Sequence, residues 1–291
     1  MNEVDKLIFN QSPPRHLYHY SSSAGVLGIL ESGAVWASSC RSMNDDHEIR
    51  HAVNVLVHSF KNHLNTKTSM SHDHVTNASN HLLVLGEKYL GHCAVSFSES
   101  GDLLSQWRAY GADGRGISLG FNSVLLSADA HDAGFALGKC IYDYNVQYAI
   151  CSSFWDKALA GLHLPSLEAG LSLALTSEVE IFLYRAGIFM KNPAFIDEKE
   201  WRIVSGENHL YSSQWKYKAK SSGLAAYIVV PLNRLFSAEI DGAPAETIPH
   251  FDFTIGPKVK HSPTTIILQS LAQRITGKGH GIGISGVPYI D

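Results

Sequence analysis

Two glutamates that flank a lysine are the strongest candidates for chemistry in this sequence. Glu198 and Glu200 stand on either side of Lys199 at the start of an apolar run, and on a strand both carboxylates would share one face. Paired carboxylates in a cleft can divide their roles, because one stabilises a developing cation while the other activates a nucleophile. The alternative is a solvated charge cluster at the end of a loop. Taken alone, the motif favours that alternative.

A histidine between two tyrosines is the second candidate. His19 lies between Tyr18 and Tyr20 on a predicted strand over 17–21, so its ring points to the face opposite both tyrosines. A histidine placed in this way could present its ring in a cleft. The alternative is a half-buried, hydrogen-bonded histidine in an aromatic strand. That alternative is the commoner one for an isolated histidine.

Hydroxyl, amide, cationic and aromatic side chains gather in two short segments. Residues 96–99 read Ser-Phe-Ser-Glu, and residues 104–111 read Leu-Ser-Gln-Trp-Arg-Ala-Tyr-Gly. Trp107 and Tyr110 could stack on a flat ring, and Arg108 could pair with a phosphate. An arginine packed on a tryptophan beside a turn explains the pattern equally well.

The remaining candidate contacts are more isolated. Arg41 follows a predicted strand and could hold an anion through forked hydrogen bonds, whereas the nearby Asn44 and Asp45 favour a helix cap. The H-x-H pair His72 and His74 has no third ligand nearby, so we expect no metal site. The sequence contains no nucleophile elbow, no C-x-x-C pair and no glycine-rich nucleotide motif.

The composition limits the class of protein. The chain has 291 residues, of which 45% are hydrophobic and 17% charged, enough apolar material for one substantial core. A net charge of −4 excludes a globally basic surface for nucleic acid, although Lys216, Lys218 and Lys220 alternate and would share one face of a strand. A solvated sheet edge is the commoner reason for such a pattern. Four widely spaced cysteines and the lack of a long apolar stretch predict a cytoplasmic protein without a membrane partner.

The order of predicted elements indicates one α+β domain over 1–291. It has a central mixed, partly antiparallel sheet, with a helical insertion and flanking helices. Helix signals include a cap at Ser22 or Ser23 and a terminating Gly33. We expect an extended lead-in over 1–15, helical regions over 47–91 and 148–192, and a helix over 262–276. Pro193 should end the second helical region. Strands are expected over 17–21, 35–38, 93–97, 116–121, 139–144, 200–204, 225–230, 251–255 and 281–285, with a hairpin-like excursion between 116–121 and 139–144.

Together these segments resemble a bacterial family known only as domain of unknown function twenty-nine seventy-one. The resemblance covers nearly the whole chain from about residue 17. It is carried by residues 17–20, 44–45 with 48, 97–99 with 104–111, 115–121, 198–203 and 255–257. The family name supplies no activity.

A second resemblance concerns activity. The opening pattern of an aromatic residue, His19, one further residue and a serine, followed by a helix ending at Gly33, is similar to the start of ADP-ribosyltransferases, including those that modify DNA. Those enzymes carry a histidine or arginine on the first strand, a Ser-x-Ser strand, and a glutamate entering a late strand. The matching positions are His19, residues 96–98 and Glu200. Glu198 with Glu200 also resembles the E-x-E motif of the arginine-modifying members.

This resemblance implies an ADP-ribosyltransferase-like fold and NAD as the substrate. Glu200 would stabilise the cation that forms when the nicotinamide–ribose bond breaks, Glu198 would orient or deprotonate the acceptor, and His19 would hold a ribose. The further nucleotide contacts would come from Tyr20, Arg41, Ser98, Trp107, Arg108 and Tyr110.

The resemblance leaves the acceptor and the setting open. The acceptor could be a protein or a nucleic acid, and the protein could serve as a toxin or a phage-defence effector, with an antitoxin or a second copy as partner. One alternative is an NAD glycohydrolase, in which water is the acceptor. Another is a non-enzymatic nucleotide-binding module, in which the glutamates only pair with Lys199 and Arg202. An enzyme requires His19, Glu200 and an aromatic ring to converge on one cleft.

Overall fold

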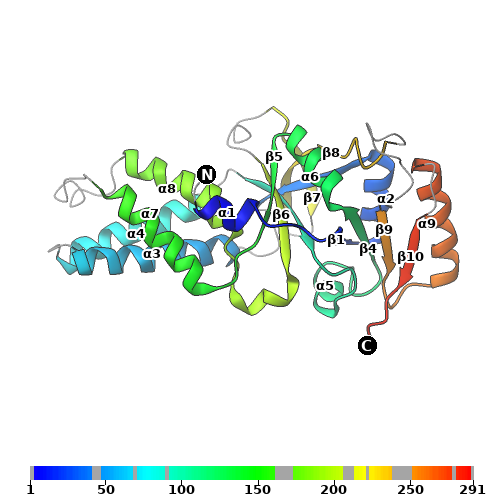
Figure 1. Ribbon diagram of the computed structural model, residues 1–291, viewed down its shortest axis with the longest axis horizontal. Coiled ribbons are helices and arrows are strands. Elements are labelled where there is room, and N and C mark those ends of the chain that lie inside the picture. Colours follow the sequence, from blue (N-terminus) through cyan, green and yellow to red (C-terminus); the bar gives the residue numbers. More distant parts are fainter. Residues whose placement is uncertain are drawn as a thin grey trace.

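The computed structural model describes residues 3–40, 47–67, 71–88, 92–160, 173–205, 213–220, 223–237, 251–276 and 280–289. A mixed sheet occupies the centre and one end of the molecule, and a group of four helices projects from the other end (Figure 1). The expected α+β class with a central mixed sheet is confirmed. Among the described helices, none is both long enough and apolar enough to cross a membrane.

Ten strands of the described residues form one sheet. Its main order is β10-β9-β4-β1-β3-β2-β8-β7, and β6 and β5 branch from β3. Among the pairings between the described strands, only that of β9 with β10 is parallel. An isolated parallel bridge also joins Ile141 to Met190. The strands are β1 (His16–Ser21), β2 (Ala34–Ser39), β3 (Cys93–Ser98), β4 (Ile117–Asn122), β5 (Phe135–Lys139), β6 (Glu200–Ser205), β7 (Lys216–Lys220), β8 (Gly223–Pro231), β9 (Phe251–Ile255) and β10 (Gly281–Ile284).

The sheet divides at β3. Strand β6 pairs with β3 from Ala94 to Ser98 along one edge. On the opposite edge β1 pairs at Ser98, whereas β2 pairs at Cys93 and Ala94. Strands β1 and β2 are both antiparallel to β3, so they run in the same direction, and each pairs with a different end of this edge. They separate over residues 95–97, and we call this opening the fork.

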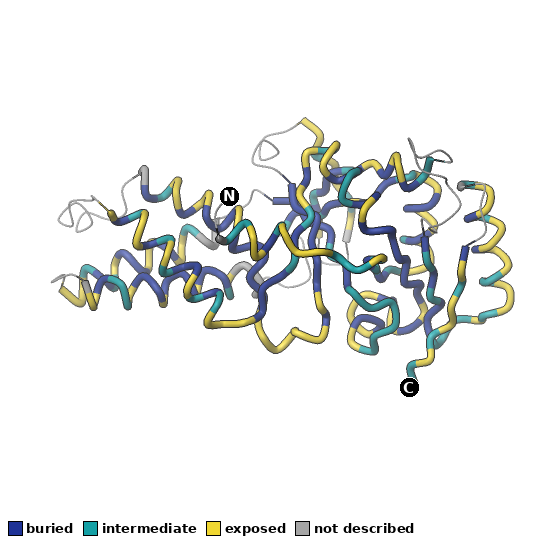
Figure 2. Tube along the Cα trace, viewed as in Figure 1, coloured by how far each residue is buried: buried dark blue, intermediate teal, exposed yellow. Residues whose placement is uncertain are grey.

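Two apolar cores lie on opposite faces of the sheet. One face packs against α3 (His47–Lys67), α4 (His72–Lys88), α7 (Tyr144–Ala158) and α8 (Leu173–Arg185), and Ala94 and Val204 belong to this core. The other face packs against α2 (Ser23–Ser32), α6 (Ser123–Asp132) and α9 (His261–Thr276), with Phe97 and Ile203 among its buried side chains. Figure 2 shows the buried sheet between helices whose outer sides are exposed.

Local signals set several boundaries. Ser22 is the N-cap of α2, where its hydroxyl accepts a hydrogen bond from the Gly25 N–H, and Gly33 ends the helix with a positive φ of 61°. This helix was predicted with both of its ends. The helical region expected over 47–91 contains two described helices, α3, which ends at Lys67, and α4, which begins at His72. The family motif over 104–111 contains the short helix α5 (Leu104–Ala109).

Three sequence predictions need correction. The lead-in over 1–15 contains helix α1 (Glu3–Phe9), whose Ile8 is buried in the core beside β5. The predicted hairpin-like excursion is helix α6, because Asn122 caps two N–H groups. A strand was expected over 139–144, but strand β5 lies earlier in the chain and ends at Lys139.

The end of the long helical region also differs from the prediction. Helix α8 ends at Arg185, followed by the 3-10 helix η3 (Gly187–Phe189). Pro193 does not end a helix but begins the 3-10 helix η4 (Pro193–Glu198), where its fixed φ suits the first turn.

Candidate functional site

Four charged side chains form a buried cluster where η4 leads into β6. Lys191, Glu198, Glu200 and Arg202 are all buried, and Glu200 keeps only 4% of its surface exposed. Charged groups are almost never buried to this degree unless they are paired. We call these four residues the charge cluster.

The chain places the two glutamates by a turn rather than by strand alternation. Asn192 caps the start of η4 by accepting a hydrogen bond from the Ala194 N–H, and Glu198 ends this helix. Lys199 adopts the left-handed conformation, with φ 44° and ψ 53°, and Glu200 then begins β6. The glutamates therefore meet because they bind the same lysine, and not because they alternate along one strand.

The cluster balances two carboxylates with two cations. Lys191 Nζ donates to Oε2 of both Glu198 and Glu200. Arg202 donates through Nε to Glu200 Oε1 at 2.7 Å and through Nη2 to Oε2 at 3.1 Å, and its Nη1 donates to the Ile188 carbonyl at 2.6 Å. Both carboxylate oxygens of Glu200 therefore bind a cation.

The pKa of Glu200 reflects this surrounding charge. Burial by itself raises the pKa of this carboxyl group. Arg202 and then Lys191 outweigh that effect and bring the pKa down to about 2. Glu200 is consequently a carboxylate at every physiological pH.

Neutral hydrogen bonds hold the cluster in place. The Glu200 N–H donates to the Tyr142 hydroxyl at 2.9 Å, and burial raises the pKa of that phenol. Gln147 Nε2 donates to the Lys191 carbonyl at 2.8 Å, and Gln147 Oε1 lies 2.8 Å from His51 Nε2. The sequence interpretation did not single out Lys191, Tyr142 or Gln147. The available signal was a lysine directly after an apolar run.

The strands that carry the predicted motifs lie side by side. Strand β3 separates β1 from β6, and its Ser98 is directly opposite both Tyr18 and Glu200. Directly opposite residues of antiparallel strands point to the same face, so Tyr18, Ser98 and Glu200 form a row. Ser98 also donates from Oγ to the Glu198 carbonyl at 2.8 Å.

His19 is one residue out of this row and faces the other side of the sheet. Its ring centroid lies 5.8 Å from that of Phe97, a residue of the core that packs against α2 and α6. Its Nδ1 lies 3.0 Å from the Ser96 carbonyl in the fork, and because a carbonyl only accepts, Nδ1 carries the proton. Burial lowers the pKa of His19, so the imidazole is neutral at pH 7. The sequence predicted its opposition to the tyrosines, but not its separation from Glu200.

Residues 106–203 match the model of a family described as a protein of unknown function, DUF2971. The match begins at Gln106 in α5 and ends at Ile203 in β6, and it confirms the family resemblance over these residues. No curated protein and no solved structure matches the chain.

The DUF2971 segment contains the whole charge cluster. Lys191, Glu198, Glu200 and Arg202 all lie within 106–203, whereas His19 and Ser98 precede it. The matched segment therefore carries the buried ion pairs together with helices α7 and α8.

The aromatic motif at the start of the DUF2971 segment is mainly a support. Trp107 is fully buried, and its Nε1 donates to Asp102 Oδ1 at 2.7 Å. Tyr20 packs edge-on against Trp107, donates from its hydroxyl to the Ser100 carbonyl at 2.8 Å and accepts from the Leu103 N–H at 3.0 Å. These contacts leave neither ring face open for a ligand.

The other predicted nucleotide contacts are exposed or lie outside the described residues. Tyr110 is exposed, and so is Arg108, whose guanidinium lies 5.7 Å from the ring centroid of Tyr289. Arg41 lies outside the described residues. In the part of the chain that the structure describes, no group of three or more histidine, cysteine, aspartate or glutamate residues is arranged to hold a metal ion.

Proposed function

We propose that this protein is an ADP-ribosyltransferase-like enzyme that cleaves NAD at the nicotinamide–ribose bond and transfers ADP-ribose to an acceptor. One observation carries the proposal: the strand order β1-β3-β6 sets the three motif-bearing strands side by side, with Ser98 between Tyr18 and Glu200. A role as a bacterial toxin or phage-defence effector follows from the same resemblance.

The proposed chemistry uses the ionised Glu200. The bond between the ribose C1′ and the nicotinamide nitrogen breaks, and its electron pair leaves with nicotinamide. The ribose becomes an oxocarbenium-like cation, which a fixed carboxylate stabilises. The pKa of about 2 supports Glu200 in this role, since no proton has to be removed first. The acceptor then bonds to C1′, and its proton passes to Glu198.

The mechanism requires a change of partner at Glu200. Lys191 Nζ now donates to Glu200 Oε2, where a ribose hydroxyl of NAD would have to donate. In the proposed complex the hydroxyl replaces Lys191 there, and Lys191 keeps Glu198 as its partner. Arg202 continues to hold Glu200 Oε1, so the carboxylate keeps its orientation.

The other predicted site residues do not contact the reacting bond in this proposal. His19 is a positioning residue, because it binds the Ser96 carbonyl from the face opposite Glu200. Tyr20 and Trp107 support the segment that covers Tyr18, whose ring lies against Gly101. Arg108 and Tyr110 are exposed and remain candidates for contact with the nucleotide.

Release of nicotinamide tests the proposal. Purified wild-type protein and Glu200→Gln are incubated with NAD, with and without a cell lysate as a source of acceptors. We expect release by the wild type and its loss in Glu200→Gln. The matched control is Glu99→Gln, which removes a carboxylate bound to Lys139 and Trp201 outside the charge cluster and should keep the activity. Circular dichroism confirms that each variant is folded.

The same assay separates the alternatives. Release without any acceptor indicates an NAD glycohydrolase, in which water attacks C1′. Both cluster glutamates are buried and pair with Lys191, and Glu200 also pairs with Arg202, whereas His19 lies on the opposite face of the sheet. These observations favour the second candidate function, a non-enzymatic nucleotide-binding module. A folded wild-type protein that binds NAD but releases no nicotinamide, even with lysate, would rule out the enzyme in favour of that module.

A further inference from the structure

A second set of side chains lies on the open part of the sheet, on the other side of the fork from His19. Strands β2, β8 and β7 are neighbours, with Trp36 opposite Val229 and Lys216 opposite Tyr227. Because residues two apart on a strand share a face, Trp36, Tyr227, Val229, Lys216 and Lys218 all point to one side. We call these five residues the stacking face.

The aromatic part of this face is partly open to solvent. Trp36 and Tyr227 stack with their ring centroids 4.4 Å apart and an angle of 24° between the rings. Lys218 Nζ lies 5.2 Å from the Trp36 centroid and 5.5 Å from the Tyr227 centroid. Trp36 nevertheless keeps 47% of its surface exposed. A rigid, exposed indole beside a cation suits a planar ring that is attached to a negative charge.

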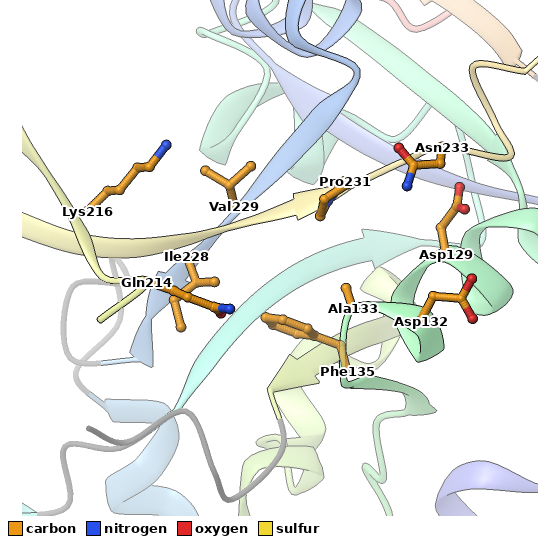
Figure 3. Close-up of a pocket in the computed structure, with 10 residues that line it drawn as sticks. All are labelled: Asp129, Asp132, Ala133, Phe135, Gln214, Lys216, Ile228, Val229, Pro231 and Asn233. Atoms are coloured by element: carbon orange, nitrogen blue, oxygen red, sulfur yellow. The ribbon is translucent and has the colours of Figure 1, made fainter. Parts of the chain in front are cut away.

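A pocket of about 430 Å³ adjoins the stacking face and shares Lys216 and Val229 with it. Phe135 and Ile228 give it an apolar side. Figure 3 shows Asp129, Asp132 and Asn233 at one end of the pocket and Gln214 and Lys216 at the other.

The polar ends of the pocket suit the edge of a nucleobase. Arg234 lies beside the acidic end and pairs with both aspartates, so the negative charge there is partly compensated. The carboxylate and amide oxygens accept hydrogen bonds, and the amide nitrogens donate them, which matches the amino and carbonyl groups of a base. The volume falls within the range of small-molecule sites.

We propose that the stacking face and the pocket together bind single-stranded nucleic acid. One base stacks on Trp36, a neighbouring base enters the pocket, and the phosphate between them lies at Lys216 and Lys218. The Trp36 ring and the pocket can each take one base, and the two lysines lie between them. This arrangement suits a single-stranded nucleic acid better than a mononucleotide. The inference does not depend on NAD chemistry, because Trp36, Lys216 and Lys218 lie outside the charge cluster. Lys218 does act on His19, since its charge helps to lower the pKa of that imidazole, so Trp36 and Lys216 give the independent test.

Fluorescence anisotropy of a labelled single-stranded oligonucleotide tests this proposal. We expect the full chain to bind it, with affinity that rises from a mononucleotide to a short oligomer and falls with added salt. Trp36→Ala should weaken binding about tenfold, the range expected for one lost stacked base, and Trp36→Phe should restore much of it. Lys218→Ala and Lys216→Ala should each reduce the slope of the salt dependence by about 0.7.

The matched control is Lys157→Ala, which removes an exposed lysine in the last turn of helix α7, outside strands β2, β7 and β8. Its binding and salt dependence should equal those of the wild type. The proposal fails if folded wild-type protein does not bind the oligonucleotide, if Lys157→Ala weakens binding as much as Lys218→Ala, or if a mononucleotide competes as well as the oligomer.

Discussion

The charge cluster and the stacking face occupy the same side of one sheet, but the polar groups of the first are buried and those of the second are more exposed. Ser38 on β2 and Val204 on β6 both pair with Ala94 of β3, so Trp36 and Glu200 point to the same side. Helices cover the sheet at Glu200, and its charge is matched by buried cations. At Trp36 about half of the side chain is exposed, Lys216 is exposed as well, and Lys218 lies against the Trp36 and Tyr227 rings.

The comparison indicates where function and stability reside. A buried charge must be paired inside the protein, so each member of the charge cluster depends on the others. An exposed aromatic ring with a neighbouring lysine contributes little to folding and remains available to a ligand. Variants in the two regions should therefore differ in what they change.

The largest effect is expected at the centre of the charge cluster. Lys191→Met removes the buried cation that pairs with both Glu198 and Glu200, so it should lower the free energy of unfolding by about 3–5 kcal/mol. Urea denaturation measures the change. Lys157→Met on α7 is the matched control and should stay within about 0.5 kcal/mol of the wild type. Equal stability of Lys191→Met and the wild type would contradict a paired, buried cluster.

The pH dependence of stability should identify Glu200 next. Its folded-state pKa of about 2 lies below its usual value of 4.5. The stability that comes from its ion pairs is therefore fully present above about pH 4.5 and is lost as the pH falls towards 2. Denaturation of wild type and Glu200→Gln across this window should give a shallower acid loss for the variant. Identical slopes would show that Glu200 is not held as a carboxylate.

A smaller effect is expected at the fork. His19→Ala removes the donor to the Ser96 carbonyl and should cost about 1–2 kcal/mol, because a polar group then loses its partner. His19→Asn supplies a shorter donor and should recover part of the loss. Hydrogen exchange at β3 and thermal unfolding report the result. A loss in His19→Ala that His19→Asn fails to reduce would point to packing against Phe97 instead.

The smallest effect on folding is expected on the stacking face. Trp36→Ala should change the free energy of unfolding by less than about 1 kcal/mol, because the ring is already half exposed. The same variant should lose affinity for single-stranded nucleic acid, so stability and binding would separate here. A destabilisation as large as that of Lys191→Met would assign Trp36 to the core.

Much of the fold was predictable from local patterns. Helix α2 was predicted with both of its ends, because Ser22 and Gly33 act within the chain around them. The errors arose where a local pattern was ambiguous. The apolar pattern of residues 123–132 is weak, but the Asn122 cap and the burial of Leu125, Leu126 and Ala130 on one side stabilise helix α6.

The sequence by itself determined the α+β class, the family resemblance later confirmed over 106–203, and the choice of Glu198 and Glu200 as candidate residues. The tertiary structure alone decided which residues meet. Lys191 approaches both glutamates because η4 and the left-handed Lys199 fold the chain back on itself. The register of β1, β3 and β6 aligns Tyr18, and not His19, with Ser98 and Glu200. Because successive residues of a strand point to opposite faces, His19 lies on the face opposite Glu200.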